Sequence, residues 1–269
     1  MSARTDPTGA AAASVAAAEP LSLWLGRGEH EAGARVLRFE YSSRGDRVPG
    51  RLLLPVSGKR PFPLVLLQHG AGGSKESDYL DAARLPWVRR GVAVASIDLP
   101  LHGERASAKL SEALLRSLGE RDGAAAVLQH EFARQAKADL HRALDALEFL
   151  PELDATRVAY AAFSLGAILG AAFVAADPRP RAAALALAGA GFGAELDPAR
   201  VLGGFAPRPL LLVNALRDER IPRAAAEALH ASAGEPKEIV WFDSGHGDLP
   251  GRALKAMWRF LARELGVEA

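Results

Sequence analysis

A strand turns directly into a helix within the stretch RVAYAAFSLGAILG, residues 157–170. Arg157–Phe163 is expected to be a strand, and Leu165–Ala176 is expected to be a helix. Residues 162–166, AFSLG, are a variant of G-x-S-x-G with alanine in the first glycine position. Small residues on both sides of a serine allow the sharp turn that exposes its hydroxyl group. The stretch therefore predicts either a nucleophile at Ser164 or an ordinary serine cap at the start of a helix.

Strands and helices alternate through the rest of the chain. An antiparallel hairpin is predicted first, from Val36–Tyr41 and Val48–Leu54. Buried strands are then expected at Pro63–Gln68 and Val92–Asp98, and further strands at Ala182–Ala188, Pro209–Asn214 and Glu238–Phe242. Helices are expected at Ser77–Arg90, Gly123–Leu150, Arg223–Ser232 and Gly251–Leu265. Leu99–Asp122 is predicted to be irregular. The alternation predicts a mostly parallel sheet with helices on both faces, and functional residues at the carboxyl ends of its strands.

Length and composition are those of a globular protein. The 269 residues fit one large α/β domain, which we expect at residues 21–269. Residues 1–20 are rich in alanine and are expected to be a disordered tail. The alternative for this segment is a signal peptide, with Arg4 in the charged region and Ala10–Ala18 as the apolar region. Because Asp6 offsets Arg4 and the apolar stretch holds no Leu, Ile or Phe, we favour the tail and a cytoplasmic protein.

Charge and cysteine content exclude several classes of function. The formal net charge is +1, which argues against nucleic acid as a partner. The chain has no cysteine, so disulfides, thiolate metal sites and a cysteine nucleophile are excluded. No uncharged apolar run approaches the roughly 18 residues of a membrane span. A homodimer is compatible with the composition.

Two titratable residues lie just beyond later predicted strands. Asp218 and His246 each follow a strand end by a few residues, and glycines flank His246. Taken alone, Asp218 would be a solvated loop acid paired with Arg217 or Arg220, and His246 would be a surface histidine. Together with Ser164 they give the order Ser, Asp, His at one edge of the sheet. This order predicts a catalytic triad in which His246 takes the serine proton and Asp218 stabilises the imidazolium.

A glycine-rich segment, HGAGG at residues 69–73, follows a predicted strand. Its backbone suits an oxyanion hole formed by the N–H groups of Ala71 and Leu165, each worth about 3 kcal/mol of barrier. The residues expected to contact substrate are His69, Gly70, Gly72 and His102. A simple glycine turn is the alternative, whereas a phosphate loop would need the G-K-[ST] ending that GAGGSK lacks.

Two other patterns point to different chemistry. Asp98 and His102 are metal-ligand types, but no third ligand accompanies them, and they are expected to shape a loop at the rim of the site. Residues 189–194, GAGFGA, fit the dinucleotide pattern G-x-G-x-x-A. That pattern should open a helix in the first strand-helix unit, whereas this one is late in the chain and Pro198 interrupts the expected helix.

These motifs resemble those of the α/β-hydrolase superfamily, and within it the small dienelactone-hydrolase-like and acetyl-esterase-like members. The matching segments are LLQHGAGGS, DLPLHGE, AAFSLGA, RPLLLVNALRDERIP and DSGHGDLP, in the family's order from about Val36 to the C-terminus. The resemblance implies the α/β-hydrolase fold, a mostly parallel eight-stranded sheet, the triad Ser164, Asp218 and His246, and no metal or organic cofactor. The segment 189–206 is too short for a full lid, so we expect a minimal cap. Dienelactone hydrolases usually use cysteine, which argues against a dienelactone substrate here.

The expected function is a serine hydrolase that cleaves small to medium carboxylic esters through an acyl-enzyme on Ser164. The partner is then a small-molecule ester. The same fold also serves thioesterases, aminoacyl or peptide hydrolases, cofactor-free lyases and perhydrolases, and a non-catalytic binding protein could retain it. The sequence leaves these alternatives open, because a fold does not fix a substrate.

Overall fold

The computed structural model describes residues 19–118, 123–193 and 196–268. The tail expected at residues 1–20 lies outside the described residues, except for Glu19 and Pro20. None of the helices in the described ranges is both long enough and apolar enough to cross a membrane.

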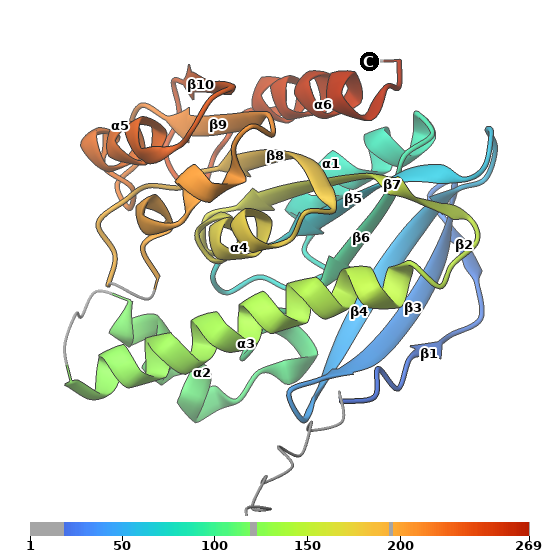
Figure 1. Ribbon diagram of the computed structural model, residues 1–269, viewed down its shortest axis with the longest axis horizontal. Helices are drawn as coiled ribbons and strands as arrows, with labels where there is room; N and C mark the ends of the chain where they lie inside the picture. Colours follow the sequence, from blue (N-terminus) through green and yellow to red (C-terminus); the bar gives the residue numbers. More distant parts are fainter. Residues whose placement is uncertain (1–18, 119–122, 194–195, 269) are drawn as a thin grey trace, which may run out of the picture.

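A ten-stranded sheet runs through the described part of the chain (Figure 1). Its strands are β1 (Trp24–Leu25), β2 (Glu29–Glu31), β3 (Ala34–Ser43), β4 (Asp46–Pro55), β5 (Phe62–Gln68), β6 (Ala93–Ile97), β7 (Leu153–Phe163), β8 (Pro180–Ala186), β9 (Leu210–Ala215) and β10 (Lys237–Phe242). They lie in the order β1-β3-β4-β6-β5-β7-β8-β9-β10, with β2 paired to β3. The hairpin β3–β4 is antiparallel, β4 is antiparallel to β6, and the pairs from β6 to β10 are parallel. The mostly parallel sheet is confirmed, and the short β1 and β2 extend the eight expected strands.

Helices cover both faces of the sheet, as the alternating pattern predicts (Figure 1). On one face lie α1 (Asp78–Arg89) and α6 (Gly251–Leu265), joined by stacking of Trp87 on Trp258 with ring centroids 6.1 Å apart. The other face carries α3 (Gly123–Leu147), α4 (Leu165–Ala176) and α5 (Arg223–Ser232). With apolar side chains packed from both sides, β5 is buried along its whole length.

One connecting segment differs from its expected structure. Within Leu99–Asp122, predicted to be irregular, the chain forms a 3₁₀ turn η1 (Gly103–Arg105) and a helix α2 (Ala108–Ser117). The helical signal is a four-residue spacing of leucines at 110, 114 and 118, interrupted by charged residues. Leu114 is fully buried in a small cluster with Leu165. The helix therefore packs beside the strand-to-helix turn at Ser164.

The connection between β8 and β9 is short. Its described residues form two 3₁₀ turns, η2 (Pro198–Arg200) and η3 (Leu202–Phe205), and no longer helix. The described positions of the dinucleotide-like pattern, residues 189–193, also lie outside any helix. The described part of this connection thus adds only two short turns, as its length predicts.

Candidate active site

Ser164 stands at the turn between β7 and α4. Its backbone has φ 49° and ψ −117°, a positive φ that non-glycine residues rarely adopt. The turn is fixed from both sides, because the Ser164 N–H donates to the Ala186 carbonyl at 2.8 Å and the Ser164 carbonyl accepts from Ala167 and Ile168. The strained backbone presents the hydroxyl at the carboxyl edge of the sheet, as a nucleophile elbow requires.

Small residues let this turn lie close to its neighbours. A Cβ added at Gly166 would lie 2.4 Å from the His69 carbonyl oxygen, so only glycine allows the start of α4 to approach the loop after β5. Ala162, which occupies the first glycine position of the motif, is fully buried and pairs with Gln68 of β5. Its methyl group is accommodated within the sheet.

Asp218 follows β9 and is held by backbone donors. Its Oδ1 accepts from the N–H groups of Arg220 at 2.9 Å and Ile221 at 2.8 Å. Its side chain is only 2% exposed. The arginine pairings considered for Asp218 are not formed, because Arg217 binds Asp243 and the side chain of Arg220 lies nearest to Glu219.

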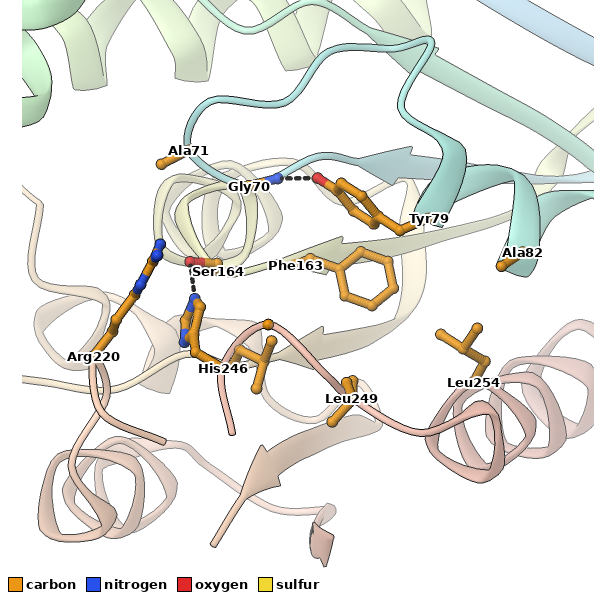
Figure 2. Close-up of a pocket in the computed structure, with 12 residues that line it drawn as sticks. Gly70, Ala71, Tyr79, Ala82, Phe163, Ser164, Arg220, His246, Leu249 and Leu254 are labelled. Atoms are coloured by element: carbon orange, nitrogen blue, oxygen red, sulfur yellow. Dashed lines mark hydrogen bonds between the residues drawn. The ribbon is translucent and has the colours of Figure 1, made fainter. Parts of the chain in front are cut away.

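His246 connects Asp218 to Ser164 (Figure 2). Its Nδ1 lies 2.9 Å from Asp218 Oδ1 and 2.8 Å from Oδ2, and its Nε2 lies 2.9 Å from Ser164 Oγ. Because an ionised carboxylate only accepts hydrogen bonds, we place the proton of the neutral imidazole on Nδ1. Nε2 is then free to accept the serine hydroxyl. The three residues that the sequence grouped thus form one hydrogen-bonded chain.

Two backbone N–H groups lie beside Ser164. Ala71 and Leu165 both line cavities that reach the serine, and neither N–H donates a hydrogen bond to another described residue. Orphan donors at the start of a helix and in a glycine-rich loop suit a negative oxygen. The role of these donors in an oxyanion hole stays a prediction.

Buried side chains hold the glycine-rich loop that carries Ala71. Nε2 of His69 accepts from the Leu99 N–H at 3.1 Å, and its Nδ1–H donates to the Gly70 carbonyl at 2.8 Å. Burial lowers the pKa of His69 to about 4. The Gly70 N–H donates to the Tyr79 hydroxyl at 2.8 Å, and burial raises the pKa of this tyrosine. The conformation of the loop therefore depends on a neutral imidazole and a protonated phenol.

A buried ion pair anchors the far end of this loop. Lys75 Nζ lies 3.0 Å from Asp98 Oδ2 and also binds the carboxylate of Glu104. Asp98 accepts in addition from the N–H groups of Lys75 at 2.7 Å and Glu104 at 2.9 Å. His102 donates through Nδ1 to the Pro100 carbonyl at 2.8 Å. The Asp98 carboxylate is thus already bound by the Lys75 ammonium and two backbone N–H groups. No group of three or more metal-ligating side chains occurs among the described residues.

Two cavities flank the hydroxyl of Ser164. The first, of about 330 Å³, is walled mainly by Tyr79, Ala82, Phe163, Leu187, Leu249 and Leu254 (Figure 2). The second, of about 260 Å³, is walled mainly by Leu118, Leu165, Ile168, Phe192, Leu196 and Ile221. The residues common to both are Ala71, Ser164, Arg220 and His246. The site therefore offers an apolar compartment on each side of the serine.

Not every residue expected to contact substrate reaches these cavities. Gly70 lines the first cavity, whereas His69, Gly72 and His102 line neither of them. Two further residues that line the cavities, Tyr79 and Arg220, were not predicted as site residues from the sequence. Arg220 lies two positions after Asp218, and this closeness in sequence is the signal that could have identified it. Tyr79, in the first turn of α1, has no comparable signal, because no sequence pattern predicts that its hydroxyl contacts the Gly70 N–H.

Comparisons with known proteins identify the family and the fold. The family model for acetyl xylan esterase (AXE1) matches residues 23–188. A cold-adapted esterase from an Arctic intertidal metagenomic library superposes with a TM-score of 0.74 at 24% identity, covering 89% of this chain and 97% of that chain. The acetyl xylan esterase from Paenibacillus sp. R4 gives a TM-score of 0.73 at 20% identity, with 91% and 89% covered. The corresponding enzyme from Thermoanaerobacterium sp. JW/SL YS485 gives 0.70 at 17%, with 91% and 88% covered. No curated protein sequence matches the chain significantly.

Proposed function

Since the chain belongs to the acetyl xylan esterase family, we propose that it hydrolyses small carboxylic esters through an acyl-enzyme on Ser164. Family membership makes it a carboxylic ester hydrolase of the α/β-hydrolase superfamily. The observation that carries the proposed mechanism is the chain of hydrogen bonds from Asp218 through His246 to Ser164, at the junction of two cavities.

The first half-reaction forms the acyl-enzyme. His246 Nε2 takes the hydroxyl proton as Ser164 Oγ bonds to the ester carbonyl carbon, and Asp218 stabilises the imidazolium. The N–H groups of Ala71 and Leu165 stabilise the negative oxygen of the tetrahedral intermediate. The intermediate collapses when the bond from carbon to the alcohol oxygen breaks, and His246 gives its proton to that oxygen. In the second half-reaction, water takes the place of the alcohol and releases the carboxylic acid.

The volumes of the two cavities favour small substrates. Their volumes of about 330 and 260 Å³ leave room for small to medium acyl and alcohol groups on the two sides of Ser164. The short connection from residue 189 to 206 contributes no long helix over the site in its described part. We therefore expect short-chain esters to be hydrolysed without activation by a lipid interface.

The experiment is turnover of p-nitrophenyl acetate and butyrate combined with labelling by a fluorophosphonate probe. We expect the wild type to turn over both esters and to carry the probe on the peptide that contains Ser164. Ser164→Ala should lose the label and about 10⁴-fold or more in kcat. Equal rates in the two proteins, or a label on another peptide, would overturn the proposal.

A pH profile gives a second check on the same mechanism. The proposed reaction needs a neutral imidazole as its base, so kcat/KM should fall at acid pH. A rate that stays flat from about pH 5 to 9 would argue against histidine as the base.

A further inference from the structure

Arg220 brings a positive charge into the candidate active site. It lines both cavities together with Ser164 and His246. Figure 2 shows its side chain extending alongside His246 toward Ser164 and Ala71. Apart from Arg220 and the titratable His246, the residues that line the two cavities are uncharged. Among the residues that line the two cavities, Arg220 is thus the one that carries a permanent charge.

The guanidinium is positioned by its backbone but is not neutralised by a strong ion pair. The Arg220 N–H is bound to Asp218, which fixes the start of the side chain. The nearest carboxylate is Glu219, whose Oε1 lies 3.8 Å from Arg220 Nε while its Oε2 accepts from the His246 N–H at 3.3 Å. The terminal nitrogens of Arg220 bind no other described residue. They remain available to a ligand, on a side chain that is 68% exposed.

An arginine in this state suits a carboxylate. The guanidinium presents parallel N–H donors that bind a planar carboxylate through two hydrogen bonds. Acetyl or alkyl groups would pack against the apolar walls of the cavities without interacting with the guanidinium charge. We propose that Arg220 binds a carboxylate of the substrate, so that the preferred esters carry a carboxylate within a few bonds of the scissile carbonyl. This inference rests on the proposed function, because it assigns a specificity to the same site.

The test compares esters that differ in charge but hardly in shape. One pair places the group on the acyl side, monoethyl succinate against ethyl succinamate. The other pair places it on the alcohol side, acetoxyacetate against acetoxyacetamide. Acid release is followed by pH-stat for the wild type, Arg220→Gln and Arg220→Lys. Arg223→Gln is the matched control, because Arg223 is nearby in the chain but pairs with Glu227 and lines neither cavity.

We expect kcat/KM in the wild type to favour the carboxylate over the amide in at least one pair, by about tenfold. This ratio should fall to one or below in Arg220→Gln, be partly retained in Arg220→Lys, and stay unchanged in Arg223→Gln. Raising the salt concentration should reduce the ratio in the wild type, because ions screen a partly exposed pair. The pair that shows the preference identifies the side of the ester that carries the carboxylate.

The outcomes separate the two proposals. The role of Arg220 is refuted if the wild type hydrolyses the amide-bearing esters as well as the carboxylate-bearing ones. It is also refuted if Arg220→Gln keeps the preference for the carboxylate-bearing esters. In both cases the esterase proposal stands. If the wild type hydrolyses none of the four esters and takes no fluorophosphonate label, the proposed function itself fails. Equilibrium titration of Ser164→Ala with acetoxyacetate and acetoxyacetamide measures the charge preference without turnover. Equal affinity for both, together with equal affinity in the acyl-side pair, would also refute the role of Arg220.

Discussion

Two segments meet at the candidate active site, and they are held in different ways. The nucleophile turn, residues 162–170, depends on small residues and backbone hydrogen bonds, with Gly166 against the His69 carbonyl and Gly170 against the ring of Tyr160. The glycine-rich loop, residues 69–77, is held by polar side chains, mainly His69, Tyr79 and the Lys75–Asp98 ion pair. The nucleophile turn should therefore be sensitive to volume, and the glycine-rich loop to charge and pH.

The largest expected effect lies at the centre of the nucleophile turn. Ser164→Gly removes the proposed nucleophile and should lower kcat by about 10⁴-fold or more. Because glycine adopts positive φ without strain, the same change should raise the free energy of unfolding by about 1 kcal/mol. Hydrolysis of p-nitrophenyl acetate and urea denaturation measure the two effects. A loss of stability would contradict the idea that the turn is strained for function.

The ion pair of the glycine-rich loop should give the largest effect on stability. Lys75→Met leaves the Asp98 carboxylate buried without its cation, and we expect unfolding to require about 3–5 kcal/mol less. Removing both charges in Lys75→Met/Asp98→Leu should cost less than the two single changes together, because no charge is left unpaired. Urea denaturation of the four proteins gives this coupling directly. Additive losses would show that the loop does not depend on the pair.

His69 predicts a pH dependence of stability. Its pKa is about 4 in the folded protein, below the ordinary value of 6.5, so the unfolded chain takes up the proton more readily. Stability should therefore fall as the pH drops from about 6.5 toward 4, by up to about 3 kcal/mol from this residue. Denaturation curves at several pH values, for the wild type and His69→Gln, measure this contribution. If the free energies of unfolding of the two proteins fall in parallel with decreasing pH, the acid sensitivity belongs to other groups.

Close packing around Gly166 predicts a smaller loss of stability at the nucleophile turn than at the Lys75–Asp98 ion pair. The new methyl group of Gly166→Ala would meet the His69 carbonyl, and we expect stability to fall by about 1–3 kcal/mol. The glycine-rich loop must move to make room, so kcat should fall more than KM rises. Ala175→Gly, at a half-buried position of the same helix, is the comparison for a simple change of helix propensity. A variant as active as the wild type would show that the two segments move independently.

The smallest effect is expected at Tyr79. Tyr79→Phe removes the hydroxyl that accepts from Gly70 and should cost about 1 kcal/mol of stability while keeping the aromatic wall of the first cavity. If the hydroxyl also positions the loop, kcat for a short ester should fall while KM changes little. Steady-state kinetics on p-nitrophenyl acetate separates the two constants. A rise in KM alone would assign Tyr79 to substrate contact instead.

The same contrast explains what the sequence could predict. The order of strands and helices and the grouping of Ser164, Asp218 and His246 follow from local patterns, since each residue lies just beyond a recognisable strand. The contacts of Lys75 with Asp98 and of Tyr79 with Gly70 join segments that only folding brings together. Arg220 was considered only as a pairing partner for Asp218, because no sequence pattern gives the direction of an arginine side chain. Strands β1 and β2 are too short to show a period.

The stacked tryptophans between α1 and α6 have a practical consequence for spectroscopy. Of the four tryptophans in the chain, Trp87 and Trp258 are buried together between α1 and α6, whereas Trp24 is exposed and Trp241 is half-buried. Intrinsic fluorescence and near-ultraviolet dichroism will therefore report mainly on the docking of these two helices. A local opening of the glycine-rich loop would leave both signals largely unchanged, and its detection calls for amide hydrogen exchange at residues 69–77.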